Sequence, residues 1–168
     1  MSVHEHKEKS KKRVACFVLT VSDTRDATTD HSGQVIKALL EQAGHELSGY
    51  RIIKDEPAEI RNLLQDTLVA SDVDAVIVNG GTGISPRDGT YEVVSGFLQK
   101  RLDGFGEIFR FLSYQEIGSA AIMSRAVAGV ASGKILISLP GSKAAVDLAM
   151  RRLVLPELGH MVSQLQGT

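Results

Sequence analysis

The residues of this chain best suited to chemistry lie in one polar segment, residues 79–90. This segment reads Asn-Gly-Gly-Thr-Gly-Ile-Ser-Pro-Arg-Asp-Gly-Thr. Its three closely spaced glycines would let backbone N–H groups approach phosphate oxygens closely. Arg87 adds a cation, and Asp88 has the carboxylate needed to hold a metal ion between phosphates. The segment therefore predicts an anion site, just before a helix whose N-terminal dipole favours negative charge.

The spacing of this segment differs from that of the two common phosphate-binding motifs. It matches neither Gly-x-x-x-x-Gly-Lys-Ser/Thr nor Gly-x-Gly-x-x-Gly. Glycine pairs are frequent in loops, so a plain glycine-rich turn is the alternative interpretation. We favour the anion site because Gly80-Gly-Thr-Gly83 is followed by Arg87-Asp-x-Thr90 at a helix start, a pattern more specific than the glycines alone.

Short apolar runs predict the strands that carry this segment and a second polar loop, residues 22–33. Residues 14–21 and 75–78 are rich in β-branched side chains, which is typical of strands buried on both faces of a parallel sheet. Residues 45–54 predict a further strand. Ligands in open α/β sheets bind beyond the carboxyl ends of the strands, which is where the two polar loops begin.

Helices and a hairpin complete the predicted fold. A hairpin is expected around Ser132-Gly133, within residues 126–139. Apolar residues at helical spacing predict helices over residues 34–43, 57–70, 90–100, 104–114 and 143–164. Thr90 should cap the third of these helices and Pro156 should kink the last. Strands that alternate with helices predict an α/β fold, with a mostly parallel sheet and helices on both of its faces.

Length and composition describe one globular domain. The chain has 168 residues, of which 43% are hydrophobic and 23% charged, and this argues against disorder. A net charge of −1 argues against a strongly basic nucleic-acid binder or a polybasic membrane binder. No apolar stretch approaches the roughly 18 residues that a spanning helix needs, and the single cysteine, Cys16, is expected to be a buried, inert thiol. We expect a cytoplasmic protein without nucleic-acid or membrane partners, with a flexible N-terminal arm over residues 1–12 and one domain over residues 13–168.

Several motifs, taken in order, resemble the MoaB/MogA family of molybdenum cofactor biosynthesis proteins, whose relatives include the gephyrin G domain. They are Leu19-Thr-Val-Ser-Asp23, Asp30-His-Ser-Gly33, Gly80-Gly-Thr-Gly83 with Arg87-Asp-Gly-Thr90, Ser124-Arg125 with Ala128-Gly129, and Leu139-Pro-Gly-Ser142. The segment from Gly104 to Gly118 resembles the MoaB branch in particular. On this resemblance, residues 13–168 form a single molybdopterin-binding domain.

The resemblance implies a three-layer α/β/α fold that assembles as a homo-trimer, or as a hexamer in the MoaB branch. It also implies an enzyme, a nucleotidyltransferase in which the terminal phosphate of molybdopterin attacks the α-phosphate of ATP. The products would be adenylylated molybdopterin and pyrophosphate, with Mg²⁺ as the cofactor and ATP as co-substrate. The molybdate-insertion protein that uses the product is an expected contact.

The resemblance also assigns roles to individual residues. Asp55 and Asp88 match the two acids of active members and would be the catalytic residues, as ligands of Mg²⁺. Ser124 and Arg125 would contact the pterin end or its phosphate. The residues expected to bind substrate or phosphate are Ser22, Asp23, Ser32, Gly33, Gly80, Gly81, Thr82, Gly83, Arg87, Thr90, Ser124, Arg125, Pro140, Gly141 and Ser142.

Several of these residues have purely structural alternatives. Asp55 could only cap a helix, since Asp is a preferred N-cap residue, and Ser32 could be the N-cap of the helix that starts near Gly33. Asp23 could be a turn residue whose side chain bonds its own backbone. Asp88 could be a first-turn helix acid, and Arg125 could form a structural ion pair at a subunit contact.

The chain as a whole also has a second interpretation, a non-catalytic molybdopterin-binding or assembly protein of the same pathway. The resemblance includes MoaB-branch members that lack the activity. Gly89, which follows Arg87-Asp88, is smaller than the residue that many catalytic relatives carry, whereas the presence of both acids favours the enzyme. The apolar residues gathered over residues 104–117 suit a subunit interface or a buried helix face.

Overall fold

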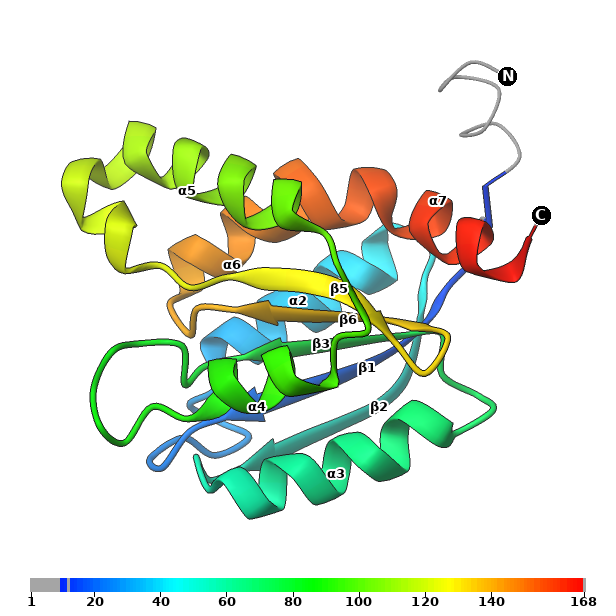
Figure 1. The fold of residues 1–168 in the computed structure, drawn as a ribbon, viewed down its shortest axis with the longest axis horizontal. Coiled ribbons are helices and arrows are strands. Elements are labelled where there is room, and N and C mark those ends of the chain that lie inside the picture. Colours follow the sequence, from blue (N-terminus) through cyan, green and yellow to red (C-terminus); the bar gives the residue numbers. More distant parts are fainter. Residues whose placement is uncertain (1–9, 12, 168) are drawn as a thin grey trace.

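A computed structural model describes residues 10–11 and 13–167, so the arm predicted over residues 1–12 lies mostly outside the described part of the chain. Within that part, six strands form one sheet in the order β2-β1-β3-β6-β5-β4 (Figure 1). Their bounds are β1 Ala15–Val21, β2 Glu46–Ile53, β3 Ala75–Asn79, β4 Lys100–Arg101, β5 Val127–Ala131 and β6 Lys134–Leu139. β1 pairs in parallel with β2 and β3, and β3 pairs in parallel with β6. β5 pairs antiparallel with β6 and β4. This confirms the predicted, mostly parallel sheet.

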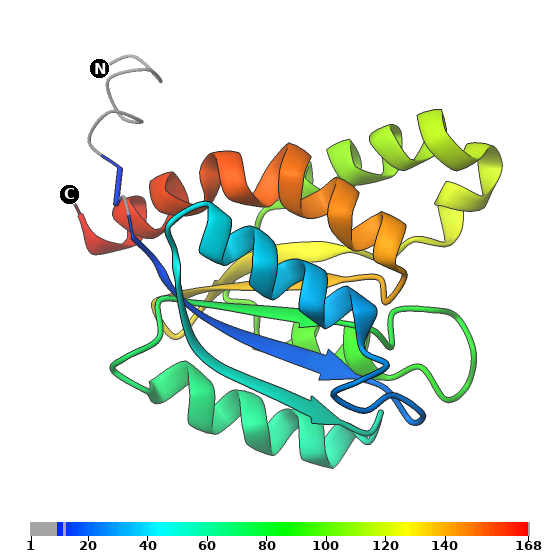
Figure 2. The ribbon, with the colours of Figure 1, turned by 180° about the vertical axis from the view of Figure 1, so that it is seen from behind.

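Helices cover both faces of the sheet (Figures 1 and 2). One face carries α2 His31–Gln42, α5 Asp103–Ile117, α6 Lys143–Ala149 and α7 Leu155–Gln166, and the other carries α3 Pro57–Val69 and α4 Thr90–Phe97. The predicted three-layer α/β/α fold is thus confirmed. Among the described residues, no helix combines the length and the apolar character needed to cross a membrane.

The central strands are apolar on both sides because each side contributes to a separate core. In β3, Ala75 and Ile77 belong to the core under α2, α5 and α6, whereas Val76 and Val78 belong to the core under α3 and α4. All four are fully buried. Cys16 in β1 lies in the first core, where burial raises the pKa of its thiol to about 12, as expected for an inert cysteine.

The structure corrects three predicted helix ends. α2 begins at His31, before the predicted residue 34, because Asp30 is its N-cap residue and accepts a hydrogen bond from the Gly33 N–H. Thr90 does not cap α4, since Gly89 occupies the cap position. The same helix ends at Phe97, and the two residues of β4 pair with β5 at the edge of the sheet. Two residues carry too little periodicity to reveal a strand in sequence.

The C-terminal helix and the hairpin follow the prediction more closely. The helix is interrupted by a π-helical segment, η2 Met150–Val154, just before Pro156. Proline lacks the N–H that would bond to the carbonyl four residues earlier, so this is where an irregular turn is expected. The hairpin between β5 and β6 is confirmed, and its two turn residues, Ser132 and Gly133, both have positive φ (49° and 71°).

Candidate functional site

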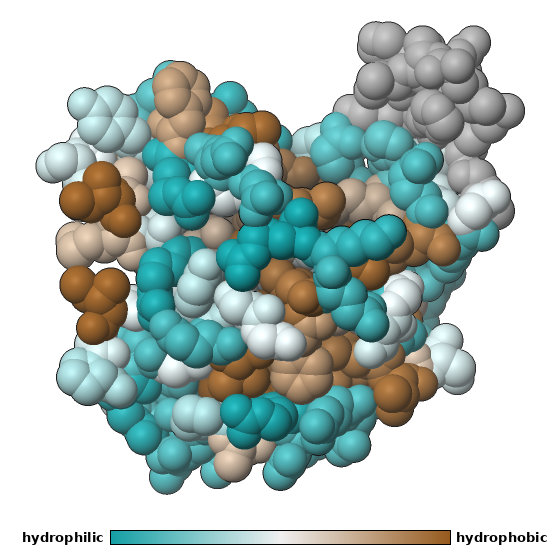
Figure 3. Space-filling view, in the orientation of Figure 1, coloured by the Kyte–Doolittle hydropathy of each residue, from teal (hydrophilic) through white to brown (hydrophobic). Residues whose placement is uncertain are grey.

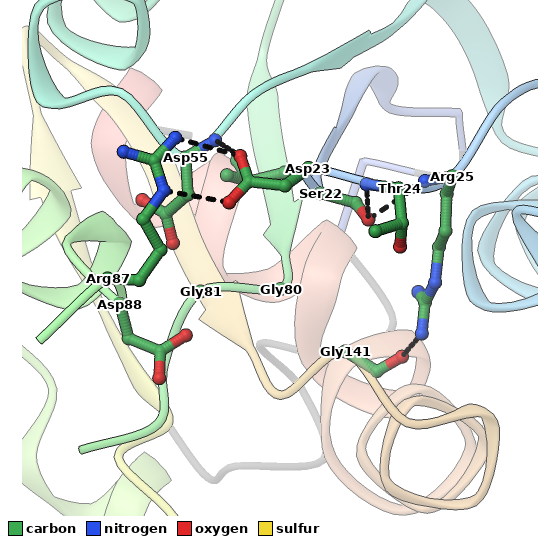
Figure 4. Close-up of a pocket in the computed structure, with 11 residues that line it drawn as sticks. Ser22, Asp23, Thr24, Arg25, Asp55, Gly80, Gly81, Arg87, Asp88 and Gly141 are labelled. Atoms are coloured by element: carbon green, nitrogen blue, oxygen red, sulfur yellow. Dashed lines mark hydrogen bonds and ion pairs between the residues drawn. The ribbon is translucent and has the colours of Figure 1, made fainter. Parts of the chain in front are cut away.

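A polar cavity of about 260 Å³ opens at the carboxyl ends of the parallel strands. The loop after β1, the segment after β2, the glycine loop after β3 and the turn after β6 all reach it (Figure 4). It is lined by Val21, Ser22, Asp23, Thr24, Arg25, Asp55, Gly80, Gly81, Arg87, Asp88 and Gly141. The structure therefore brings both expected acids, and six of the fifteen residues expected to bind substrate or phosphate, to one cavity.

The glycine loop fits only glycine at two positions. Gly80 and Gly81 have φ values of +98° and +63°, a conformation that other residues rarely adopt. A Cβ atom on Gly81 would overlap the side-chain oxygens of Thr90 and Asp55, and one on Gly80 would overlap the carbonyl of Val21. The chain can thus bring backbone close to the acidic side of the cavity only because these side chains are missing.

Asp55 is a nearly buried carboxylate, 5% exposed, at the acidic side of the cavity. Its Oδ1 accepts hydrogen bonds from the Gly89 N–H (3.2 Å) and from Thr90 Oγ1 (3.3 Å). The cap interpretation is wrong for the helix that follows it, because Glu56 is the N-cap residue of α3. Burial raises the pKa of Asp55, and the negative charges of Asp88 and Asp23 raise it further.

Asp88 lines the same cavity and lies before α4, so it is not the first-turn helix acid of the alternative interpretation; Glu92 is. Its Oδ2 accepts a hydrogen bond from the Ser85 N–H (3.1 Å). Mg²⁺ in phosphate-transfer sites commonly binds one or two carboxylates and takes its other ligands from phosphates and water. Two neighbouring acids, one with a raised pKa, fit that requirement. No group of three or more acids, histidines or cysteines suited to a metal occurs among the described residues, so the remaining ligands would come from the substrate and water.

Arg87 is held by carboxylates rather than left available as a cation. Its guanidinium donates to both oxygens of Asp23 (2.8 and 3.0 Å) and pairs with Glu56 (2.6 Å). Asp23 also accepts from the Asp55 N–H (3.1 Å), so it links the loop after β1 to the segment after β2. The hydrogen bonds from Arg87 lower the pKa of Asp23. The turn interpretation of Asp23 is wrong: the side chains that accept from the backbone of this loop include Ser22 and Asp26.

Three predicted ligands are buried behind the cavity wall rather than exposed in it. Ser32 is 1% exposed and its Oγ bonds to Asn79 Oδ1 (2.9 Å), and it is not a helix cap, because Asp30 fills that position. Gly33 is buried beside it in the first turn of α2. Thr90 is fully buried and faces Asp55. In this structure these residues support the site from behind.

A second hollow, of about 380 Å³, lies on the other side of the glycine loop and is more apolar. It shares Gly81, Asp88 and Gly141 with the first cavity. Its other lining residues are Thr82, Gly83, Phe109, Ser113, Ile117, Ala120, Met123, Ser124, Pro140, Ser142 and Ala145. Ser142 caps α6 by accepting from the Ala145 N–H (3.2 Å), whereas the buried Ser124 Oγ has no hydrogen-bond partner among the described residues. That oxygen is suited to a ligand.

Comparison with known proteins decides the family. Residues 17–160 match the family model described as "Probable molybdopterin binding domain". The chain is 52% identical over 166 residues to molybdenum cofactor biosynthesis protein B of Halalkalibacterium halodurans, with 98% of each chain covered. The chain belongs to the MoaB family. The corresponding protein of Bacillus subtilis is 50% identical over 167 residues, covering 99% of this chain and 98% of its own.

Solved structures agree with this membership of the MoaB family. A crystal structure of a molybdenum cofactor biosynthesis protein B superposes with a TM-score of 0.91 at 47% identity, covering 95% of this chain and 100% of that one. The tungsten cofactor synthesizing protein MoaB of Pyrococcus furiosus gives 0.84 at 34% identity, covering 94% and 99%. The resemblance recognised from the motifs is therefore confirmed.

Arg125, expected to contact substrate in this MoaB chain, lines neither hollow and instead holds the glycine loop. Its Nε donates to the Thr82 carbonyl (2.8 Å), and its Nη2 donates to the Gly83 carbonyl. Its remaining nitrogen pairs with Glu92 in the same chain, and the guanidinium lies over the Tyr91 ring. Arg125 thus forms a structural ion pair, with a residue of its own chain, and a pair at a subunit contact stays a prediction.

Two positions that matter to the site were missed in the sequence. Arg25 lines the polar cavity, and Asp30 is a fully buried carboxylate directly behind it. The spacing from Asp30 to Gly33 is that of an N-cap motif, which is a usable signal. Nothing local in the sequence of residues 22–33 indicates that Arg25 turns back toward Gly141, because that contact spans 116 residues.

Proposed function

We propose that this chain is a molybdopterin adenylyltransferase. The observation that carries the proposal is the placement of Asp55 and Asp88 on one side of a polar cavity whose floor is the Gly80–Gly81 backbone. Membership of the MoaB family supports molybdopterin as the ligand. An oxygen of its terminal phosphate would attack the α-phosphorus of ATP, and the bond from that phosphorus to the leaving pyrophosphate would break.

The roles of the residues follow from what such a transfer requires. Phosphoryl-type transfer needs positioning and charge neutralisation more than covalent chemistry. Asp55 and Asp88 would hold Mg²⁺, which would supply positive charge to the phosphates. Backbone N–H groups of the glycine loop would donate to phosphate oxygens. Burial and, to a smaller extent, the charges of Asp88 and Asp23 raise the pKa of Asp55, and a divalent cation beside it would favour its charged form.

The two hollows suggest how one ligand could span the site. The polar cavity is suited to phosphates, and the more apolar hollow beside it is suited to a flat heterocycle. Gly81, Asp88 and Gly141 border both, so the two compartments lie next to each other. A ligand that joins a ring to phosphate could thus occupy both at once.

The direct test is to incubate the pure protein with molybdopterin, ATP and Mg²⁺ and to identify the products by mass. Adenylylated molybdopterin and pyrophosphate in equal amounts are expected. If molybdopterin binds tightly but stays unmodified, the chain is instead the non-catalytic binding or assembly protein. A control without Mg²⁺ should give no product.

We also propose that the chain works as a homo-oligomer, a trimer or a hexamer. Large apolar side chains of α5 and of the 3₁₀ segment that follows it, η1 Gly118–Met123, reach the surface (Figure 3). They are Ile108, Phe111, Tyr114, Ile117, Ile122 and Met123, all more than half exposed. Large apolar side chains gathered on one exposed helix face are typical of interfaces. A sedimentation mass of a single chain at micromolar concentration would contradict it.

A further inference from the structure

We propose that Arg25 is the phosphate-binding cation of the polar cavity and that its hydrogen bonds to Ser32 and Gly141 hold it in place. Of the two arginines that line the cavity, Arg87 lies beside the acids, whereas Arg25 lies across the glycine loop from them, next to Gly141 (Figure 4). The inference rests on the proposed function and deepens it by naming the residue that meets the phosphates on the side away from the acids.

The two arginines differ in the groups that they bind. Arg87 is bound by two carboxylates at 2.6 to 3.0 Å, so its charge is already compensated. Arg25 donates through Nη1 to Ser32 Oγ (2.7 Å) and through Nη2 to the Gly141 carbonyl (2.9 Å), both of which are neutral acceptors. The other three N–H groups of its guanidinium have no partner among the described residues. One third of its side chain is exposed, toward the cavity.

The nearest carboxylate, that of Asp30, cannot neutralise Arg25 fully. It lies 3.8 Å from Nη1, beyond hydrogen-bond distance. Its oxygens are occupied by Thr20 Oγ1 (2.6 Å), the Tyr50 hydroxyl, the Gly33 N–H (3.0 Å) and the Ser32 hydroxyl. Burial alone would raise the pKa of Asp30, but these hydrogen bonds outweigh it, so the carboxylate stays charged.

This network orients Arg25 before any ligand arrives. Ser32 accepts from Arg25 and is itself fixed by Asn79, the last residue of β3 and the neighbour of Gly80. Asn79 also donates to Thr20 Oγ1 (2.9 Å) in β1. The loop after β1, the glycine loop and the turn at Gly141 are therefore tied together through one guanidinium. A cation fixed in this way loses little conformational freedom when it binds an anion.

The chemistry of the site fits an anion with several oxygens. A planar guanidinium with three unpaired N–H groups can make two parallel hydrogen bonds to one phosphate. Two sources could supply that phosphate, the polyphosphate of ATP or the single phosphate of molybdopterin. Inorganic pyrophosphate and inorganic phosphate are matched probes for these two sources.

The experiment is calorimetric titration of the full chain with each probe, in the presence of Mg²⁺. Arg25→Gln should weaken binding of the preferred probe by about ten- to hundred-fold, the effect of one lost charged hydrogen-bonding group. Arg151→Gln, the matched control, should change it less than about threefold, because Arg151 is paired with Asp147 (2.9 Å) and does not line the cavity. Arg25→Lys, which keeps the charge and loses the planar fork, should fall between the wild type and Arg25→Gln.

The possible results distinguish a failure of the role proposed for Arg25 from a failure of the proposed adenylyltransferase activity. Equal losses in Arg25→Gln and Arg151→Gln, no loss in folded Arg25→Gln, or no binding of either probe by the wild type would each overturn the role proposed for Arg25. A melting curve identifies an unfolded Arg25→Gln protein, in which case Arg25→Lys decides alone. If Arg25 binds pyrophosphate and no adenylylated molybdopterin forms, the proposed function fails while the role of Arg25 stands.

Discussion

The two hollows on either side of the glycine loop are built by different means. The polar cavity is shaped by side-chain hydrogen bonds between loops, such as Arg87 with Asp23 and Arg25 with Gly141. The apolar hollow is shaped by helices, with fully buried Phe109 at its base and with Ile117 and Met123, which are mostly exposed, at its edge. The polar cavity is thus fixed in advance by directional bonds, whereas the apolar hollow depends on side-chain packing.

Phe109→Ala should have the largest effect on stability, and it tests whether helix packing shapes the apolar hollow. Removing a fully buried Phe side chain should lower the free energy of unfolding by about 3–5 kcal/mol. Val69→Ala, at a position 77% exposed on α3, should change it by less than about 0.5 kcal/mol. Denaturant titration of both variants gives the comparison. Similar small losses in both would mean that Phe109 does not support the hollow.

Gly81→Ala tests the glycine loop that divides the hollows. Positive φ and overlap with the oxygens of Thr90 and Asp55 should together cost about 2–5 kcal/mol of stability. Gly96→Ala is the control, because its Cβ would point into open space in α4 and should leave stability equal or slightly higher. A Gly81→Ala protein as stable as Gly96→Ala would show that the loop can relax.

Tyr50→Phe tests the hydrogen bonds behind the polar cavity. Loss of a buried bond to the charged Asp30 should lower stability at pH 7 by about 1–3 kcal/mol. The pKa of Asp30 is lowered in the fold, so the stability that it contributes is present above about pH 4 and is lost as the pH falls through its folded value. The difference in the free energy of unfolding between wild type and Tyr50→Phe should therefore become smaller toward pH 3. Tyr114→Phe, at an exposed position, should have the same free energy of unfolding as the wild type at both pH values.

Asp55→Asn should have the smallest effect on stability, and a favourable one. The pKa of Asp55 is raised, so its ionisation opposes folding as the pH rises above about 4. The variant should melt at or slightly above the wild-type temperature in the presence of a chelator. Mg²⁺ should then stabilise the wild type and leave Asp55→Asn unchanged. Equal stabilisation of both would remove Asp55 from the metal site.

The sequence predicted the framework of the fold because strong local patterns carry it. The apolar runs that became β1 and β3 are buried on both faces, and the positions of the two polar loops at the strand ends follow from them. β4 was missed because its two residues pair only through contact with β5. The start of α2 was misplaced because the capping side chain is Asp30, within a stretch predicted as loop.

The sequence indicated which residues gather near the cavity, but it did not indicate which of them face the cavity and which support its wall. Asp55, Asp88, Gly80, Gly81 and Gly141 do line one cavity. Arg125 and Ser32, expected to face the substrate, are used by the loop carbonyls and by the buried network instead. Whether a polar side chain faces a cavity or its support depends on contacts between segments distant in sequence, and these contacts leave no local pattern.

The central claim, that the polar cavity performs a metal-assisted transfer, is tested most directly by Asp88→Asn. Adenylyl transfer is measured at saturating molybdopterin over a range of Mg²⁺ concentrations, beside a melting curve. Loss of a preorganised charge of this kind is expected to cost about a hundred- to thousand-fold in rate, with the melting temperature nearly unchanged. A folded Asp88→Asn protein with near wild-type turnover would contradict the account and favour a protein that only binds molybdopterin.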